Sequence, residues 1–360
     1  MGSGPPAGMM NVRLQVDPAN TQLNADDNPI DPVENASDID RPKVDSVYVS
    51  SNIERRKKWR NDGYDRWDEK VVSELRVDIH TCIDILPSLK EIEIIICGGT
   101  GHGKSSVINN FMAALTGSIA NIADHGAGES QLTTQYKRIQ TWTSKDGNTR
   151  RLPLMFSDTR GFSESKVLGA PIAAIKACIL GKVLPDEQID SKQSDEWWRD
   201  RKTVKCKASY IFLVADANVV PDDGELGSII SKETVFKNLR DIREFSVTEG
   251  INVAAFLTMC DKLDPETKRA VSLLHFSKPV EIKVKAFSKM INVPENRIFP
   301  IINYTDEIRV TNEMAIQTLI ALKVCLEDIK SVLLSRPKPS PRWGKHRAKP
   351  RWWSGPDDRE

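Results

Sequence analysis

Residues 91–106 read EIEIIICGGTGHGKSS, and this stretch decides the fold of the chain. An apolar run at 92–96 predicts a buried strand that ends in glycines. The residues that match the phosphate-binding pattern GxxxxGK[ST] are Gly98, Gly103, Lys104 and Ser105. Apolar residues then recur at helical spacing, at Val107, Phe111 and Leu115. The stretch therefore predicts a strand, a glycine loop and a helix N-terminus, which is the context that a phosphate-binding loop requires.

Each residue type in this loop suits an anion. Glycines let backbone N–H groups turn inward, and the following helix adds the positive end of its dipole. Lys104 is expected to reach the β- and γ-phosphates, and the Ser105 hydroxyl to ligate Mg²⁺. The alternative is a chance glycine turn, which the flanking strand and helix disfavour. The residues predicted to line the phosphates are Gly98, Gly99, Thr100, Gly101, His102, Gly103, Lys104, Ser105 and Ser106.

Composition excludes several classes of protein. The chain has 360 residues and a formal charge of +1, which argues against a globally basic nucleic-acid binder. Its six cysteines show neither CxxC nor CxH spacing, which argues against a zinc site and a disulfide scaffold and suits a reducing compartment. No stretch approaches the roughly 18 apolar residues of a membrane span, and no signal peptide is evident. We expect a soluble, cytoplasmic protein.

The chain divides into three parts. Residues 1–45 are polar, rich in Pro, Asn and Asp, and predicted to be disordered. Residues 46–335 are predicted to form one P-loop GTPase-like domain, with an insertion at about 168–207. The tail 336–360 carries seven Lys or Arg and no acidic residue between 336 and 351. It is predicted either to contact an acidic surface, such as nucleic acid, anionic membrane or an acidic protein, or to be a disordered solubilising tail.

Strands alternate with helix-length segments through the central part. Strands are expected at 92–96, 135–143, 151–156, 210–214, 252–257 and 297–302, and helices at 68–85, 104–115, 234–245, 280–290 and 312–334. This alternation predicts an α/β fold with a doubly wound, mostly parallel sheet and helices on both faces. The phosphate loop, together with two later motifs, indicates that the sheet is of the P-loop GTPase type. The charged stretch 54–70 is predicted to be a solvated lead-in to the first helix, with contact to an acidic partner as the alternative.

A second motif follows the strand at 152–156. Asp158 and Gly161 form a DxxG sequence there. A carboxylate at the end of an apolar strand beside the phosphate loop is placed to hold Mg²⁺ through water. Gly161 has no side chain, so its N–H can approach a γ-phosphate.

Two threonines between these motifs are candidates for a nucleotide-sensing switch. Thr133 or Thr134 can offer a hydroxyl to Mg²⁺ and an N–H to the γ-phosphate, and we carry Thr134 as the metal ligand. The alternative is a β-prone pair that starts a strand. The residues do not choose between the two threonines.

A third motif concerns the base. Thr258 and Asp261 fit the pattern [NT]KxD, whose aspartate accepts hydrogen bonds from guanine N1–H and the exocyclic amine. Met259 replaces the usual lysine. The alternative role of Asp261 is a plain cap at the end of a strand.

The motifs together resemble one family. GGTGHGKSS, TTQYKRI, LPLMFSDTRGF, YIFLVADANVV, VAAFLTMCDKLD and IINYTDE are similar to the interferon-induced protein 44 and 44-like family, from about Trp59 to the closing helix. The resemblance implies a cytoplasmic GTPase-type domain, responsive to interferon or infection, with antiviral associations. By position it implies Asp158 as the end of the magnesium strand, Asp261 as the base-reading acid, and Asn303 and Tyr304 as the last guanine-contacting loop.

The expected chemistry is slow Mg²⁺-dependent hydrolysis of GTP to GDP. Lys104, Thr133 or Thr134, and Gly161 are the predicted catalytic residues. Many GTPases follow DxxG with a glutamine that orients the attacking water, whereas this chain has Phe162, which cannot do so. We therefore expect acceleration by a partner chain or by another group, with His102 and Arg160 as candidates. Arg160 is alternatively a solvent-facing switch residue.

Two other functions stay open. One is a pseudo-GTPase scaffold that holds nucleotide without turnover, and the other is an ATP-using P-loop NTPase. Whether the protein acts alone is equally open. The switch region and the insertion at 168–207, with Trp197 and Trp198, are the predicted surface for a homodimer or protein partner.

Overall fold

The computed structural model describes residues 57–86, 91–119, 123, 135–145, 148–163, 170–189, 192–205, 207–224, 233–304 and 309–335. The predictions for residues 1–45 and for the tail 336–360 lie outside these ranges. Within the described parts of the chain, no helix combines the length and hydrophobicity that a membrane span requires.

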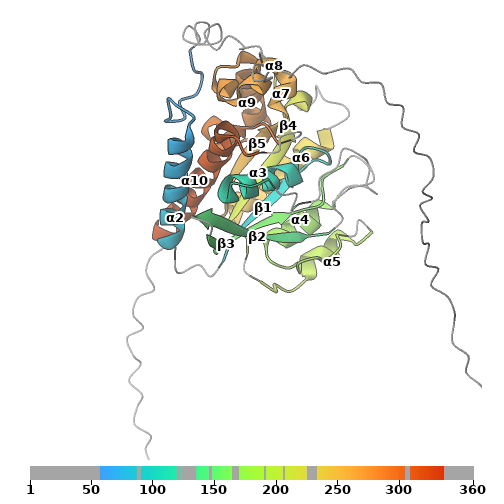
Figure 1. The fold of residues 1–360 in the computed structure, drawn as a ribbon. Helices are drawn as coiled ribbons and strands as arrows, with labels where there is room; N and C mark the ends of the chain where they lie inside the picture. The colour runs from blue at the N-terminus through green and yellow to red at the C-terminus, as the bar shows by residue number, and fades with distance from the viewer. Residues whose placement is uncertain are drawn as a thin grey trace, which may run out of the picture. The chain divides into compact units, whose positions relative to one another are not determined.

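A six-stranded sheet forms the centre of the fold (Figure 1). Its strands are β1 (Ile92–Gly98), β2 (Lys137–Lys145), β3 (Asn148–Asp158), β4 (Tyr210–Asp216), β5 (Asn252–Thr258) and β6 (Ile298–Pro300). They lie in the order β2-β3-β1-β4-β5-β6, and only β2 runs antiparallel to its neighbour. The predicted α/β fold class with a doubly wound, mostly parallel sheet is confirmed.

Helices cover both faces of the sheet. One face packs against α2 (Glu69–Asp84), α3 (Lys104–Thr116) and α10 (Asn312–Ser335), and the other against α4 (Ile172–Ile179), α6 (Glu233–Thr248) and α9 (Lys278–Ile291). Shorter helices are α5 (Asp195–Asp200), α7 (Cys260–Leu263) and α8 (Pro265–Arg269), with 3₁₀ turns at Ala217–Val219, Val271–His275 and Glu295–Arg297. Helices α2 and α10 lie side by side, and both contribute to the same core (Figure 1).

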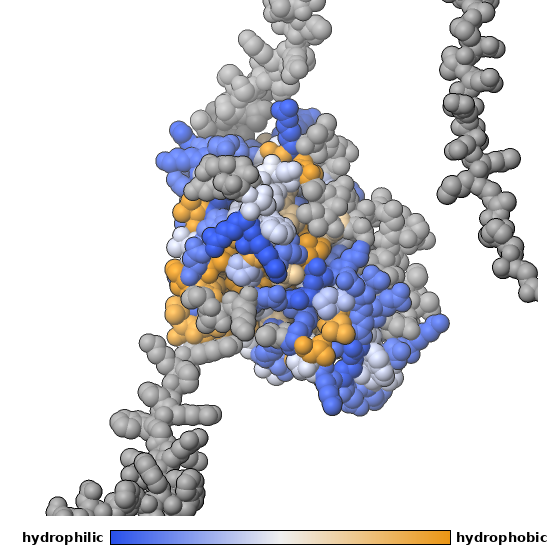
Figure 2. Space-filling model, turned by 60° about the horizontal axis from the view of Figure 1, so that its bottom comes forward, coloured by the Kyte–Doolittle hydropathy of each residue, from blue (hydrophilic) through white to orange (hydrophobic). Residues whose placement is uncertain are grey.

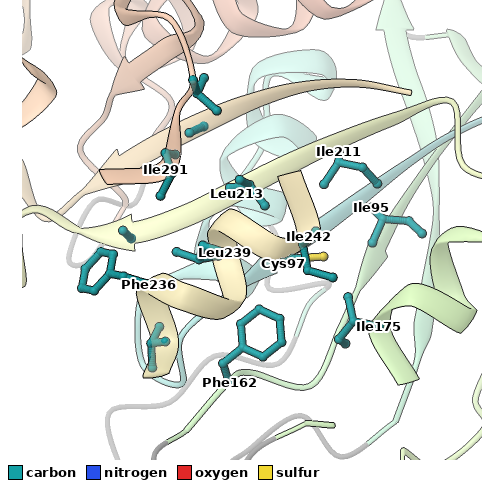
Figure 3. Close-up of a cluster of buried hydrophobic side chains, with 14 of the residues drawn as sticks. Ile95, Cys97, Phe162, Ile175, Ile211, Leu213, Phe236, Leu239, Ile242 and Ile291 are labelled. Carbon is teal, nitrogen blue, oxygen red and sulfur yellow. The ribbon is translucent and has the colours of Figure 1, made fainter. Parts of the chain in front are cut away.

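The isoleucines of β1 explain why both faces need cover. Successive side chains of a strand point to opposite faces, so Ile94 enters the core under α3 and Ile95 enters the core under α4. All seven residues of β1 are buried, as expected for a central parallel strand. On the α3 face, the ring of Phe111 stacks on Phe156 with centroids 4.5 Å apart. Figure 3 shows the other face, where Ile95 and Cys97 meet residues of α4 and α6.

The sequence analysis missed the short helices α7 and α8 and, within the predicted insertion, α4 and α5. Residues 168–207 read as a polar insertion, but the described part contains α4 and α5. Helix α4, IAAIKACI, is apolar on nearly every side and buries six of its eight residues. A helix of that kind belongs to the interior. The segment is therefore in part a component of the core.

The charged stretch before α2 is also different from the prediction. Its described residues from 57 onward pack on the domain instead of forming a solvated lead-in. The Trp59 indole donates to the Leu274 carbonyl (3.0 Å), and Arg60 donates to the carbonyls of Ile298 and Glu295. Because Ile298 begins the edge strand β6, Arg60 joins this segment to the start of that edge.

Asp62 holds the segment in place and makes stability depend on pH. Its side chain is 2% exposed and lies 2.9 Å from Nδ1 of His275. Burial opposes its ionisation, but hydrogen bonds from His275 and from the Tyr64 N–H, with the charges of His275 and Lys58, outweigh burial and lower its pKa to about 2. The ordinary value is 3.8.

A lowered carboxyl pKa stabilises the folded state above the ordinary pKa, and that contribution is lost as the pH falls through the folded pKa. We expect the free energy of unfolding of the wild type to fall by about 2 kcal/mol more than that of Asp62→Asn between pH 4 and pH 2. Urea denaturation at a series of pH values measures this. Identical pH profiles for the two proteins would contradict the assignment.

Candidate functional site

The phosphate loop follows β1, at the point where the order of strands across the sheet reverses. Strand β1 is flanked by β3 on one side and β4 on the other, both parallel to it. In open parallel sheets this switch point, at the carboxyl ends of the strands, is where ligands bind. The loop from Gly98 to Gly103 leaves β1 here and leads directly into α3.

Three of its glycines are required by the local geometry. Gly101 (φ 75°) and Gly103 (φ 84°) adopt left-handed conformations that glycine alone tolerates well. A Cβ on Gly98 would stand 2.3 Å from the carbonyl oxygen of Val214 on β4. A Cβ on Gly103 would stand 2.9 Å from Nδ2 of Asn303. The loop is therefore pressed against the neighbouring strand and against the loop that follows β6.

The structure brings Lys104, Ser105 and Asp158 together. Lys104 Nζ donates to the carbonyl of Gly99 (3.0 Å), which directs the ammonium group back over the loop. Ser105 Oγ donates to Asp158 Oδ2 (2.6 Å), and Asp158 is buried. Burial lowers the pKa of Lys104, and the charge of Asp158 opposes that shift. A hydroxyl and a carboxylate side by side are hard oxygen donors, so the pair fits a magnesium ion.

Gly161 approaches the same loop. A Cβ on Gly161 would stand 2.7 Å from Thr100 Oγ1 and 2.8 Å from Lys104 Nζ. Backbone hydrogen bonds lock this approach, because Phe162 N donates to Gly98 O (3.0 Å) and Thr100 N donates to Phe162 O (2.8 Å). The DxxG motif and the phosphate loop thus form one surface.

Phe162 itself points away from that surface. Its ring is buried in the core formed with Cys97 and Ile175 (Figure 3). The residue after DxxG therefore contributes packing to the interior.

The two candidates for charge stabilisation are both engaged elsewhere. The His102 ring is buried and lies under Gly99, where an added Cβ would stand 2.5 Å from its Cε1. Arg160 Nη1 donates to the Ile189 carbonyl (2.7 Å). The structure therefore uses His102 to support the phosphate loop and Arg160 to contact the segment after α4.

The predicted base loop is tied to the phosphate loop. Thr258 Oγ1, at the end of β5, donates to His102 O (2.8 Å). Met259 has a left-handed φ of 57° and its carbonyl accepts from Asn218 Nδ2 (3.2 Å). Asp261 follows in the first turn of α7 and is partly exposed. This arrangement places Asp261 just beyond the carboxyl end of β5, at the same edge of the sheet as the phosphate loop.

Asn110 is a residue of this region that the sequence analysis missed. It lies on α3 and is buried. Its Nδ2 donates to Ile302 O (3.2 Å) and to Asn303 Oδ1 (3.0 Å), and its Oδ1 accepts from Tyr304 N (3.3 Å). The available signal was a pair of asparagines, Asn109 and Asn110, within an otherwise apolar stretch of helix.

Thr133 and Thr134 lie outside the described residues, but the residues that follow them do not. Gln135 forms an antiparallel β-bridge with Gln188. Tyr136 N donates to Glu187 O (2.8 Å), and Asp186 N donates to Tyr136 O (2.7 Å). Arg160 contacts Ile189 in the same short segment. Residues 186–189 therefore join the residues that follow the predicted switch threonines to the DxxG motif itself.

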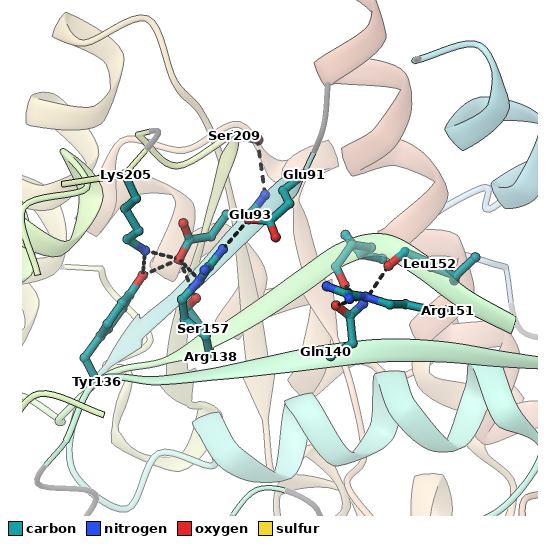
Figure 4. A network of polar contacts seen from close by, with 11 residues as sticks. Glu91, Glu93, Tyr136, Arg138, Gln140, Arg151, Leu152, Ser157, Lys205 and Ser209 are labelled. Carbon is teal, nitrogen blue, oxygen red and sulfur yellow. Dashed lines mark hydrogen bonds and ion pairs between the residues drawn. The ribbon is translucent and has the colours of Figure 1, made fainter. Parts of the chain in front are cut away.

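A buried polar network fixes Tyr136 further (Figure 4). Glu93 of β1 accepts hydrogen bonds from the hydroxyls of Tyr136 and Ser157 and from Lys205. Burial opposes ionisation of Glu93, but the charge and hydrogen bond of Lys205, with the two hydroxyl bonds, outweigh burial and lower its pKa. Lys205 comes from the segment after α5 and also donates to the Tyr136 hydroxyl. The network thus fastens that segment and the start of β2 to the central strand.

A mostly parallel sheet with a GxxxxGKS loop at its switch point and an aspartate at the end of β3 defines a P-loop nucleotide-binding fold of the GTPase type. The resemblance to the interferon-induced protein 44 and 44-like family is confirmed by comparison with known sequences. The chain is 24% identical over 223 residues to interferon-induced protein 44 of Homo sapiens, covering 61% of this chain and 48% of that protein. It is 24% identical over 242 residues to the Mus musculus protein (66% and 54%) and 23% identical over 244 residues to the 44-like protein of Homo sapiens (66% and 51%).

The chain spans about half the length of the curated relatives it matches. No protein-family model matches it. Among solved structures, it is similar to a probable GTP-binding protein engB, with a TM-score of 0.34 and 15% identity over 68% of this chain and 99% of the other. It is also similar to the bacterial selenocysteine-specific elongation factor EF-Sec, with a TM-score of 0.32 and 18% identity over 69% and 29%. The fold assignment itself rests on the strand order and the phosphate loop.

Proposed function

We propose that this chain binds guanine nucleotide with Mg²⁺ and hydrolyses GTP slowly. The observation that carries the proposal is the 2.6 Å contact between Ser105 Oγ and Asp158 Oδ2 beside the phosphate loop. A serine of the loop and an aspartate of the neighbouring strand are the pair that P-loop GTPases use around a magnesium ion and its triphosphate.

We assign the residues the following roles, and that of Thr134 comes from the sequence because this residue lies outside the described ranges. The loop amides and Lys104 bind the phosphates, and Gly161 brings its backbone N–H to the γ-phosphate. Ser105 and Asp158, together with Thr134, would hold Mg²⁺, which neutralises charge on the phosphates when bound. Asp261 would accept the two donors of guanine.

Turnover is slow in this proposal because the residue after DxxG does not orient the attacking water. The buried Phe162 ring cannot orient a nucleophile, and Arg160 is held by the Ile189 carbonyl. The same observations favour a second candidate function, a pseudo-GTPase that keeps its nucleotide and acts through its surface. A partner chain that releases Arg160 toward the site would supply the acceleration that the first candidate requires.

The biological setting is proposed from the relatives. These relatives are named interferon-induced protein 44 and 44-like, so we place this chain in an innate immune response, acting in the cytoplasm. Residues 186–189 and the neighbouring α5 are the proposed contact region for a protein partner or second copy. Leu184, Trp197 and Val204 are exposed apolar residues around it. On the face drawn in Figure 2, apolar side chains form separate patches within a largely hydrophilic surface.

Asp261→Asn tests the choice of base. We expect the wild type to bind a fluorescent GTP analogue more tightly than the matching ATP analogue, and the variant to lose at least about tenfold of that preference, because a site built for two donors is left mismatched. Single-turnover hydrolysis on the same proteins separates a slow GTPase from a pseudo-GTPase. An unchanged preference in Asp261→Asn would exclude this aspartate as the reader of guanine.

A further inference from the structure

The loop after β6 is held by two polar side chains from different helices. Gln317 of α10 accepts from Ile302 N (3.0 Å) and donates to Ile302 O (2.6 Å). Asn110 of α3 hydrogen-bonds to Ile302 O, Asn303 Oδ1 and Tyr304 N. Both side chains are buried, so the bonds are made away from bulk water, where an unmade bond is costly.

The side chain of Asn303 therefore makes its contacts within the protein. Its Oδ1 accepts from Asn110, and its Nδ2 lies against Gly103, at 2.9 Å from the position that a Cβ would take there. Tyr304 N is engaged by the same Asn110. The two residues predicted to contact guanine are thus bonded inward, toward α3 and the phosphate loop.

Three parts of the nucleotide site meet at this point. Gly103 belongs to the phosphate loop, Thr258 begins the predicted base motif, and Asn303 belongs to the loop after β6. A Cβ on Gly103 would lie 2.9 Å from Asn303 Nδ2 and 3.5 Å from Thr258 Oγ1. Backbone pairing continues the contact, because Ile301 N donates to Leu257 O (2.8 Å). A shift of the loop after β6 would therefore alter the surroundings predicted for the base, whereas Lys104 is held by its own bond to Gly99 O.

We propose that Asn110 is a positioning residue that sets the base preference of the nucleotide site. It acts through residues 302–304, without touching the nucleotide, by fixing their distance from the phosphate loop. The inference rests on the proposed guanine-nucleotide binding and identifies what holds its base-proximal loop.

The neighbouring asparagine provides a matched control. Asn109 is also buried on α3, but its Nδ2 donates to Ala123 O (3.0 Å) and its Oδ1 accepts from Ala123 N (2.9 Å). Removing either side chain takes one buried amide from the same helix. Among the described residues, the hydrogen bonds between this pair of asparagines and the loop after β6 are those of Asn110.

The experiment measures the dissociation constants of Mg-GTP, Mg-ATP and magnesium tripolyphosphate for the wild type, Asn110→Ala, Asn110→Asp and Asn109→Ala. Asn110→Asp keeps the size of the side chain and the oxygen that accepts from Tyr304 N. It removes the amide group that donates to Ile302 O and Asn303 Oδ1, so it provides a second variant if the alanine variant does not fold. We expect both Asn110 variants to lose about tenfold in GTP affinity. Tripolyphosphate affinity should stay within about twofold of the wild type, and Asn109→Ala should keep the wild-type ratio of GTP to ATP affinity.

The outcomes separate the inference from the function on which it rests. A wild type that binds neither GTP nor tripolyphosphate refutes the proposed function. A wild type that prefers GTP, with an unchanged GTP-to-ATP ratio in both Asn110 variants, overturns the positioning role alone. An equal loss for GTP, ATP and tripolyphosphate also overturns it, because that pattern indicates general damage to the site.

Discussion

Replacing Lys104 by alanine is expected to weaken Mg-GTP binding by about 100-fold or more. The ammonium group is buried and aimed over the phosphate loop by its bond to Gly99 O. Removing a buried, hydrogen-bonded charge from its partner costs 2–5 kcal/mol or more, roughly 30-fold or greater in affinity. Titration with a fluorescent GTP analogue measures the change.

Thermal unfolding of the same variant without nucleotide is the control. Burial lowers the pKa of Lys104 and the charge of Asp158 opposes that shift, and we expect the alanine variant to show a cooperative unfolding transition that establishes that it is folded. Added GTP should then stabilise the wild type and not the variant. A Lys104→Ala protein that binds GTP within about threefold of the wild type would contradict the assigned role of this lysine.

Trp198→Ala is expected to have the largest effect on stability. Trp198 is fully buried in the core beneath α4, although it belongs to the stretch that reads as an insertion. Truncating a buried tryptophan costs about 3–5 kcal/mol in the free energy of unfolding. Urea denaturation measures it.

The adjacent tryptophan is the matched comparison. Trp197 is 43% exposed and packs against the Arg201 guanidinium, 4.7 Å from its ring centroid. We expect Trp197→Ala to cost about 1 kcal/mol or less. Equal losses for the two variants would mean that α5 is not anchored in the core through Trp198. Because of this anchoring, a deletion of residues 168–207 would damage the core, and point substitutions at Trp197 are the better test for partner binding.

The parts of the fold that follow from hydrophobic pattern were predicted well. The isoleucine run of β1, the helical spacing from Val107 to Leu115 and the strand at 252–257 all form where expected. Asp68 caps α2 by accepting from Val71 N (3.1 Å), and Gly117 ends α3 in a left-handed conformation. In these elements local signals and burial point to the same structure.

The parts that depend on distant contacts were not predictable. Helix α4 has only eight residues, and periodicity alone does not identify so short an apolar run as a helix. The segment with Trp59 and Asp62 packs against residues more than 200 positions away in the sequence, which no local pattern reports. For the site, the two motifs were enough to predict that Lys104, Ser105 and Asp158 lie together. The role of Asn110 appears only in the structure, where α3 contacts the loop after β6.

The most direct test of the account is calorimetric titration of the full chain with GTP, in the presence of Mg²⁺ and again with EDTA. The account predicts saturable binding at one site per chain, and an affinity that falls when EDTA removes the metal. Absence of binding by GTP and by ATP in both conditions would contradict it.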